Sequence, residues 1–344
     1  MDTVKTVRKT FAILIISLLI GTAVNSQDIH FTQFFNNPST LNPALTGFTN
    51  SKMRLFLTHR NQWGAVSVPF QTYSAAIDAQ LLKRKQKGDM LGIGFSAFSD
   101  KAGDSKFGTQ ELQMSVSYVK ALGNSNRNLL GFGVHMGYVQ RSLDYNALYF
   151  DNQYNGSYFD PKLNTGEKFA VDNYSYTDLS AGVNWFTNIS YDFKLQTGLS
   201  VWHLNRPNQS LKDDNTVKLS IKGVFYSEAE ITLSRPYHLM PAIFIQRQGT
   251  FTEIFIGSRF KYIINQKAFD YSAFITGIFY RNKDAVALFT GFEYKSMNIG
   301  FSYDFNISSL RVASNYLGGM EVSFSWKLDR ERHPKPKDLP CPIF

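Results

Sequence analysis

Residues 297–306 read MNIGFSYDFN, and the alternation within them decides the class of fold. Ile299 and three aromatic residues take every second position, with small or polar residues between them. Successive side chains of a β-strand point to opposite faces, so this pattern predicts a strand with one apolar and one polar face. Its length suits a tilted membrane strand of about nine to eleven residues better than a soluble strand of about five or six. We therefore expect Phe301 to face lipid and Gly300 to face a polar lumen, where arginine should be better tolerated.

The same period of two recurs along the chain. In residues 320–328, for example, Met320 and Val322 alternate with Glu321 and Ser323. We predict fourteen strands, near residues 51–60, 71–82, 90–99, 109–122, 129–142, 175–188, 191–205, 216–227, 237–249, 251–264, 270–281, 284–295, 297–306 and 318–328. An even number of antiparallel strands can close into an outer-membrane barrel with both ends on the periplasmic side.

Connection lengths test this topology, because such barrels have long extracellular loops and short periplasmic turns. The long connections follow odd-numbered strands, at residues 61–70, 100–108, 143–174, 206–215 and 307–317. Two outward connections, near 248–251 and 282–283, are shorter than this rule expects, and the inward turn at 228–236 is longer. Pro241 also lies inside a predicted strand, although proline cannot donate to a β-ladder. The fold class predicted is all-β, a transmembrane antiparallel β-barrel of about 14 strands.

Composition agrees with a barrel in a lipid bilayer. Aromatic residues make up 15% of the chain and charged residues 18%, against the roughly 25% charged residues of soluble domains. No stretch after the N-terminus approaches eighteen uninterrupted apolar residues, so helical spans are not expected. The net charge of +9 could suggest nucleic acid, but the basic cluster at 83–87 lies in a predicted turn. We interpret this cluster as a solvated turn near anionic headgroups and expect no nucleic-acid partner.

The first 26 residues indicate export. Lys5, Arg8 and Lys9 precede an apolar run of about ten residues, and small or polar residues follow up to Ser26. This is the pattern of a secretory signal peptide over residues 1–26, with cleavage after Ser26. An uncleaved N-terminal anchor is the alternative.

Two flanking segments lack the alternation of the predicted barrel at 51–328. Residues 27–50 are rich in Asn, Pro, Thr and Phe, so we expect an N-terminal plug in the lumen or a segment across the periplasmic mouth. Residues 329–344 carry four of the eleven prolines and should form an extended periplasmic tail. This tail is either a docking peptide or merely solvated.

The sequence offers no support for catalysis or for a metal or cofactor site. The single cysteine, Cys341, excludes an intramolecular disulfide, and the six histidines have no paired ligand spacing. Nucleophile-elbow and phosphate-loop motifs are missing. We therefore expect a non-enzymatic protein without a cofactor.

At its two ends the chain resembles the PorP/SprF outer-membrane proteins of the type IX secretion system. The resemblance rests on residues 31–47, 60–63 and 72–73 near one end, and on residues 300–306, 308–310 and 319–322 near the other. The candidate site residues are Asn42, Pro43, Ala44, Arg60, Gln62, Trp63, Tyr303 and Asp304. Without the family, Arg60 and Gln62 could reach polar partners inside a lumen, and Trp63 suits an interface belt.

This resemblance implies a function that periodicity alone does not. It implies an outer-membrane component that supports secretion or surface retention of adhesin-like cargo proteins. The expected partners are the C-terminal domains of that cargo and periplasmic ring or peptidoglycan-linked components. The alternative is a channel for hydrophobic small molecules resembling the FadL family, which also has fourteen strands and an Asn-Pro-Ala plug.

Overall fold

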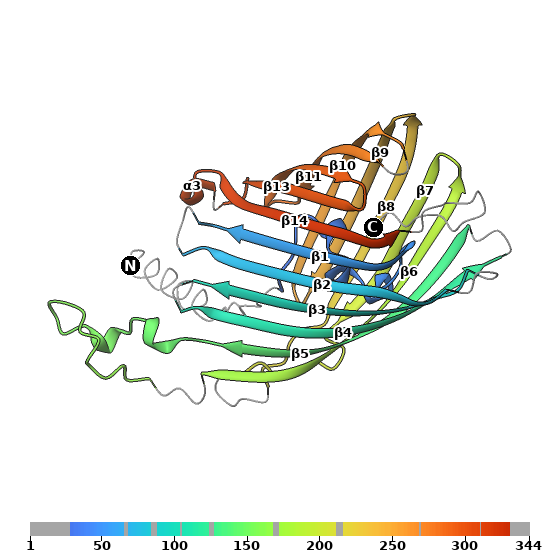
Figure 1. Cartoon of the computed structure of the whole chain (residues 1–344). Coiled ribbons are helices and arrows are strands. Elements are labelled where there is room, and N and C mark those ends of the chain that lie inside the picture. Colours follow the sequence, from blue (N-terminus) through green and yellow to red (C-terminus); the bar gives the residue numbers. More distant parts are fainter. Residues whose placement is uncertain are drawn as a thin grey trace, which may run out of the picture.

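Fourteen antiparallel strands form a closed barrel in which β1 pairs with β14 (Figure 1). The computed structural model describes residues 28–64, 68–83, 88–103, 105–123, 127–167, 172–210, 216–267, 270–309 and 311–330. The strands are β1 (Ser51–Gln62), β2 (Phe70–Lys83), β3 (Met90–Ala102), β4 (Phe107–Leu122), β5 (Asn128–Ser142), β6 (Asn173–Ser190), β7 (Phe193–Trp202), β8 (Lys222–Ser234), β9 (Tyr237–Gln248), β10 (Phe251–Asn265), β11 (Ser272–Arg281), β12 (Ala285–Tyr294), β13 (Met297–Asn306) and β14 (Leu317–Arg330). The predicted fold class is confirmed.

The seam between the first and last strands is continuous. Its register runs from Ser51 opposite Arg330 to Gln62 opposite Gly319. Long connections, including residues 143–167, lie at one end of the barrel, and short turns lie at the end where β14 finishes (Figure 1). By the rule for outer-membrane barrels, the long-loop end is extracellular and the short-turn end is periplasmic.

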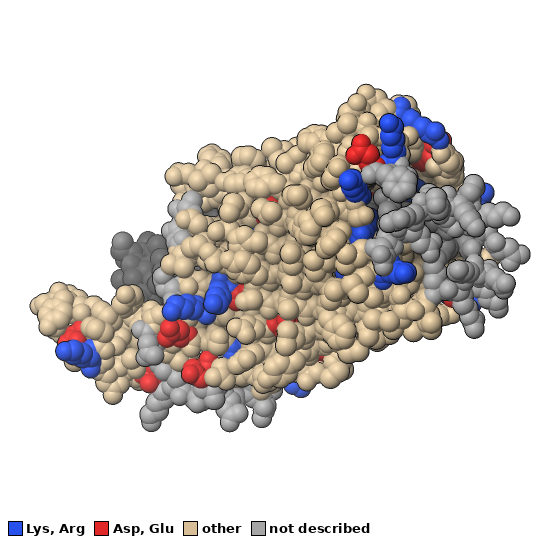
Figure 2. Space-filling model, in the orientation of Figure 1, with Lys and Arg blue, Asp and Glu red and all other residues tan. Residues whose placement is uncertain are grey.

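The two faces of each strand differ as the alternation predicts. On β13, Ile299 is 54% exposed and Phe301 43%, whereas Ser302 and Asp304 are buried in the lumen at 0% and 2%. Seen from outside, charged side chains gather toward the ends of the barrel and leave the middle of the wall to other residues (Figure 2). The apolar side chains therefore form the surface that meets lipid. No helix in the described part of the chain is long and apolar enough to cross a membrane.

The prediction for the eighth strand was wrong at both ends. β8 begins at Lys222 and continues to Ser234, so the inward turn is only Arg235 and Pro236. Within the predicted turn at 228–236, Glu228 and Glu230 lie at lumen-facing positions of β8, where Glu228 pairs with Arg259 and Glu230 with Lys194. Pro241 does lie inside β9, and no pairing between β8 and β9 is formed opposite it.

The interior of the barrel is filled by residues 28–50, which we call the plug. It contains three short helices, η1 (Phe34–Asn36), α2 (Pro38–Leu41) and η2 (Pro43–Leu45). Phe34 stacks on Phe244 with ring centroids 5.1 Å apart, and Phe35 stacks on Phe279 at 5.6 Å. The main hydrophobic core is thus formed between plug and wall. The predicted signal peptide at 1–26 and residues 331–344 of the predicted tail lie outside the described residues.

Candidate functional site

The Asn-Pro-Ala run lies at the centre of the plug and binds the barrel wall through Asn42. The Asn42 side-chain amide donates to the carbonyl oxygens of Val183 (2.9 Å) and Leu199 (3.1 Å). Its oxygen accepts a hydrogen bond from the Ala44 amide at 2.9 Å, which starts η2. Asn42 is fully buried. It therefore joins the fold of the plug to two strands of the barrel.

Glycines in β5 and β6 allow this close approach. A Cβ atom at Gly133 would lie 2.3 Å from the backbone of Pro43, and one at Gly182 would lie 2.0 Å from Oδ1 of Asn42. Such distances exclude any side chain without a shift of the plug. A glycine inside a strand often marks a place where another backbone comes close. These positions form a notch that fits the Asn-Pro-Ala segment.

Arg60 and Asp304 meet at the seam of the barrel and bind the start of the plug. Arg60 Nη2 donates to Asp304 Oδ2 at 3.2 Å, and Nη1 donates to the His30 carbonyl oxygen at 2.9 Å. The Thr32 hydroxyl donates to Asp304 at 2.9 Å. The carboxylate of Glu321 on β14 accepts the backbone amides of Thr32 (2.8 Å) and Gln33 (2.9 Å). Strands β1, β13 and β14 therefore hold the same segment.

Arg281 of β11 extends this cluster across the lumen. Its Nη2 donates to Asp304 at 2.8 Å, and its Nη1 lies 3.0 Å from Nε2 of His30. Glu253 lies 3.5 Å from the same His30 nitrogen. Charges buried this deeply persist only where they are paired and hydrogen-bonded. Removal of the plug would therefore leave buried charges without hydrogen-bond partners, which is energetically unfavourable.

A second buried ion pair fixes the far end of the plug. Arg54 Nε donates to Asp78 at 2.9 Å, and Arg54 Nη2 donates to the Leu45 carbonyl oxygen at 2.8 Å. Asp78 in turn accepts the amide of Gly47 at 2.8 Å. The plug is thus tied to β1 and β2 as well.

A third tether holds Asp28 near the extracellular end. Its carboxylate lies 2.6 Å from His203 Nε2 and accepts from Lys222 at 2.9 Å, while His203 Nδ1 lies 2.9 Å from Asp178. Burial alone would lower the pKa of His203, but the charge of Asp28 and hydrogen bonds to both carboxylates outweigh it and raise the pKa to about 9. Burial also disfavours the Asp28 carboxylate, yet Lys222 and His203 hold its pKa well below the usual value. At neutral pH the protonated His203 and the ionised Asp28 therefore form an ion pair.

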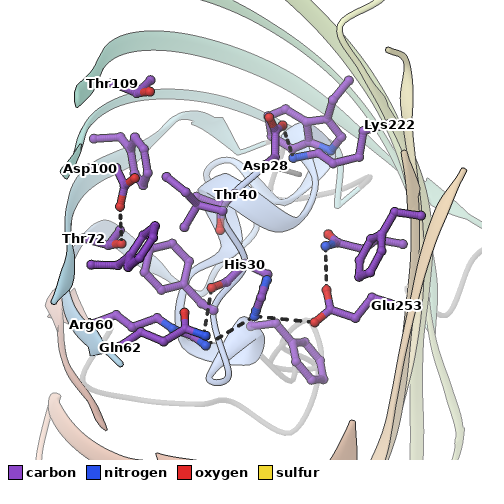
Figure 3. Close-up of a pocket in the computed structure, with 18 of the residues that line it drawn as sticks. Asp28, His30, Thr40, Arg60, Gln62, Thr72, Asp100, Thr109, Lys222 and Glu253 are labelled. Carbon is purple, nitrogen blue, oxygen red and sulfur yellow. Dashed lines mark hydrogen bonds and ion pairs between the residues drawn. The ribbon is translucent and has the colours of Figure 1, made fainter. Parts of the chain in front are cut away.

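A cavity of about 730 Å³ lies between the plug and the extracellular ends of the strands (Figure 3). Asp28, His30 and Thr40 form its floor, and Arg60, Asp100, Lys222 and Glu253 point into it from the wall. Aromatic residues, among them Phe98, Tyr176 and Trp202, lie between the charged ones. The volume falls within the range of about 300–1,000 Å³ typical of small-molecule pockets. Its charged lining suits a hydrophilic ligand.

The structure separates the predicted site residues into groups. Asn42, Pro43 and Ala44 lie in the plug, Arg60 and Asp304 form the seam cluster, and Gln62 and Trp63 line the cavity at its outer rim. Trp63 also packs edge-on against Phe70 with ring centroids 5.0 Å apart. Tyr303 is not part of the site, because it lies on the lipid side of β13 and packs against Phe305.

That arginine is tolerated better at Gly300 than at Phe301 stays a prediction, but the surroundings of Gly300 differ from those expected. Gly300 does face the lumen, but a Cβ atom there would lie 2.4 Å from Gln33 Oε1 and 2.9 Å from Asn36 Nδ2. The plug fills the space that an empty lumen would have offered.

Several residues of the site were not predicted from the sequence. Glu321, Arg281, Glu253, Asp28, His203 and Lys222 all contribute to plug binding. Those on strands could have been recognised from the sequence, because each is a charged residue at a lumen-facing position. Their partners depend on the position of the plug, which the strand pattern does not specify.

Comparison with known proteins gives one extensive match by sequence. The family described as type IX secretion system membrane protein PorP/SprF matches residues 23–325. Among curated proteins, none matches the chain.

Solved structures give distant likenesses. The toluene transporter TbuX of Ralstonia pickettii has 10% identity and a TM-score of 0.48, with 83% of this chain and 92% of that chain covered. A FadL homologue of Pseudomonas aeruginosa has 8% identity and a TM-score of 0.48, with 84% and 93% covered. CdiB from Acinetobacter baumannii has 10% identity and a TM-score of 0.42, with 80% of this chain covered, and the chain spans 60% of CdiB.

The family match includes every candidate residue of the plug, the seam cluster and the cavity rim. It extends over nearly the whole barrel, from before the plug to residue 325 of β14. The chain belongs to the PorP/SprF family of type IX secretion system membrane proteins.

Proposed function

We propose that this protein is a non-enzymatic docking component of the type IX secretion system that retains cargo at the cell surface. The family match carries the assignment to the secretion system. The plug supports docking rather than conduction, because buried ion pairs and hydrogen bonds tie it to strands around the barrel. A lumen filled in this way offers no path for a folded polypeptide.

The extracellular end offers a surface for the C-terminal domains of cargo proteins. In the connection between β5 and β6, Tyr149, Tyr154 and Tyr158 are all more than half exposed. Tyr149 packs edge-on against Phe159 with centroids 4.5 Å apart, and Tyr154 bridges to Phe159 through its backbone. Tyrosines give large amphipathic contact areas at protein interfaces. This loop is the contact that we assign to cargo.

The periplasmic end would face the machinery of the secretion system. Exposed basic residues lie at this rim, including Lys52 on β1, Arg235 in the β8–β9 turn and Lys295 in the β12–β13 turn. They give this end a surface suited to a periplasmic ring or a peptidoglycan-linked protein of acidic character.

The alternative of a hydrophobic channel is less well supported. Its cavity should be lined by apolar side chains, whereas this one holds the charged groups of Asp28, Glu253 and Arg281. Burial of an apolar ligand against such groups would strip them of water without replacing its hydrogen bonds.

The test is a deletion strain complemented with either the parent protein or a variant with Tyr149, Tyr154 and Tyr158 changed to Ser. We expect deletion to empty the cell surface of specific large proteins, as seen by mass spectrometry of shed and surface-labelled protein. The triple variant should insert normally and still lose that cargo. Growth on hydrophobic substrates serves as the control. A deletion that impairs such growth and leaves the surface proteins unchanged would favour the channel.

A further inference from the structure

The two edges of β6 are paired over different lengths. On one side, β5 pairs with β6 as far as Asn173, at its extracellular end. On the other side, β7 pairs with it only from Ala181 onward, because β7 ends at Trp202. Figure 1 shows β6 reaching the long-loop end of the barrel beside β5. In the described part of the chain, residues 173–180 therefore have a strand neighbour on one side only.

The loop after β7 closes the first part of this step in the wall. The backbone amide of Leu204 donates to the Leu179 carbonyl oxygen at 2.9 Å. The Asn205 side chain then takes the place of a further peptide group. Its Oδ1 accepts the Leu179 amide at 3.1 Å, and its Nδ2 donates to the Thr177 carbonyl oxygen at 2.6 Å. Asn205 thus ends the ladder of hydrogen bonds at Thr177.

Beyond this point the edge of β6 is open. Alternate residues of a strand direct their backbone groups to the same side, so the amides of Thr177 and Ser175 point the same way as that of Leu179. Among the described residues, none binds the Thr177 amide, and none binds the amide or carbonyl of Ser175. Both residues are exposed. Such a row of unpaired donors and acceptors is a template for another strand.

This edge also lacks the features that usually protect a free strand. Natural edge strands carry charged residues, proline or a bulge. Residues 173–177 read Asn-Tyr-Ser-Tyr-Thr, and their pairing with β5 continues without a register shift. Tyrosine and threonine are enriched in strands. The segment is therefore well suited to pair with an added strand.

The free edge lies where an extracellular molecule can reach it. Farther down β6, the outward side chains of Leu179 and Val183 are apolar and exposed, as expected of a surface that meets lipid. At Thr177 and Ser175 the outward side chains become polar. The open part of the edge therefore lies beyond the apolar band, on the side of the long loops.

The inner face beside the edge offers contacts for alternating side chains. Tyr174 and Tyr176 stack with ring centroids 6.0 Å apart, and Arg141 of β5 lies opposite Tyr174. In strand addition, backbone hydrogen bonds supply affinity and alternate side chains supply specificity. Aromatic side chains are effective partners across neighbouring strands.

The same hairpin carries the loop that we assign to cargo. The Leu143 amide at the end of β5 donates to the Asp172 carbonyl oxygen at 2.9 Å, where that loop returns to β6. The free edge therefore begins at the base of the loop that holds Tyr149, Tyr154 and Tyr158.

We propose that the free edge of β6 binds an extended strand of the cargo C-terminal domain through backbone hydrogen bonds at Ser175 and Thr177. This inference rests on the proposed role in cargo retention and specifies how the contact is made. A repeating row of amides and carbonyls matches an extended polypeptide and not a lipid or a small solute. A second copy of the barrel is less suited, because copies inserted in the same direction carry parallel β6 strands, and parallel pairs are slightly less stable.

Hydrogen exchange of the purified barrel in detergent tests whether the edge is open. The amides of Ser175 and Thr177 should exchange within seconds, whereas those of Tyr174 and Tyr176, which point toward β5, should be protected. Protection of all four amides would mean that the edge is already covered. That result would overturn the inference whether or not the protein retains cargo.

Ser175→Pro tests the role of the edge in binding. Proline is tolerated on an edge strand where its missing N–H faces away from the sheet, so this variant should insert like the parent. Ser175→Ala is the matched control, because it removes the same hydroxyl group and keeps the amide. Electrophoretic mobility with and without heating shows whether each variant is folded.

The probe is the purified C-terminal domain of the most abundant protein lost from the surface of the deletion strain. We expect it to bind the parent and Ser175→Ala equally. Ser175→Pro should bind it about tenfold or more weakly, because proline lacks the donor and its ring obstructs an added strand. In the complex with the parent, exchange of the Ser175 and Thr177 amides should slow.

Equal affinity of the domain for folded Ser175→Pro and Ser175→Ala, or fast exchange of both edge amides in the complex, would overturn strand addition and leave cargo retention intact. A deletion that leaves the surface proteins unchanged would instead refute cargo retention, and with it cargo as the occupant of the edge. Self-association of the parent that Ser175→Pro abolishes, measured by light scattering, would overturn cargo in favour of a second copy.

Discussion

Arg60 on the first strand and Asp304 on the thirteenth meet at 3.2 Å inside the lumen, although 244 positions separate them in the chain. Both also contact the plug, through the His30 carbonyl oxygen and the Thr32 hydroxyl. The pair therefore joins the barrel seam and the plug in a single polar cluster.

Replacement of Arg60 tests how much this cluster contributes to the stability of the barrel. Arg60→Met leaves Asp304 and Glu321 buried with one cation fewer, so we expect a loss of about 3–5 kcal/mol in the free energy of unfolding. Urea titration of the barrel in lipid vesicles measures it. Arg311→Met, at an exposed position of the β13–β14 loop, should change stability by less than about 0.5 kcal/mol. Equal stabilities of the two variants would contradict the role of the cluster.

The glycine notch gives a prediction about closure of the lumen. Valine at Gly133 would overlap the backbone of Pro43, so we expect Gly133→Val to displace the plug and to raise single-channel conductance in planar bilayers. Gly223→Val is the control, because a Cβ atom there has open space around it. If both variants stay closed, the notch does not position the plug.

Substitutions at two neighbouring positions of β13 should have different effects, one on stability and the other on closure of the pore. Phe301→Arg places a charge against lipid and should cost about 2–4 kcal/mol if Phe301 lies at the bilayer midplane, without opening the pore. Gly300→Arg has no room beside Gln33 and should open the pore by pushing the plug aside. Unfolding titrations and conductance, measured on the same samples, distinguish the two. A closed, stable Gly300→Arg barrel would show that the lumen has spare space after all.

The Asp28–His203 pair predicts a dependence of stability on pH. The pKa of His203 is raised to about 9. Its contribution to the free energy of unfolding is therefore complete below about pH 6.5 and is lost as the pH rises through 9. The pKa of Asp28 is lowered. Its contribution to the free energy of unfolding is therefore complete above about pH 4 and is lost on acidification. The stability difference between the parent and His203→Gln should therefore be largest near pH 4–6.5 and vanish above about pH 10. A constant difference across this range would exclude the charged pair.

Truncation tests the C-terminal tail. Arg330 still pairs with Ser51 at the seam, so removal of 331–344 should leave a folded barrel. We expect it to weaken co-purification of periplasmic partners from outer membranes. Removal of 329–344 would in addition shorten the seam and lower stability slightly. Unchanged co-purification after the first truncation would remove the docking role of the tail.

The strands could be predicted from the sequence because alternation is a local property that closure of the barrel does not change. Failures arose where lumenal chemistry interrupts the pattern, as at Glu228, whose charge resembles a turn signal but pairs with Arg259 inside the lumen. Arg60 and Asp304 were among the candidates, yet their contact with each other was not predictable. Contacts such as Thr32 with Glu321, 289 positions apart, require strand order, register and the plug position together. Glycines such as Gly133 indicate close approach but not the segment that approaches.

The bonding of Glu321 has a consequence for how the barrel can be assembled. Glu321 lies directly opposite Arg60 across the seam, and its carboxylate accepts two amides of the plug. If β1 paired with β14 before the plug entered the lumen, the Glu321 carboxylate would be buried without the hydrogen bonds from the plug amides. Joining of the ends and folding of the N-terminal segment are therefore thermodynamically coupled. We therefore expect seating of residues 28–50 to favour pairing of β1 with β14.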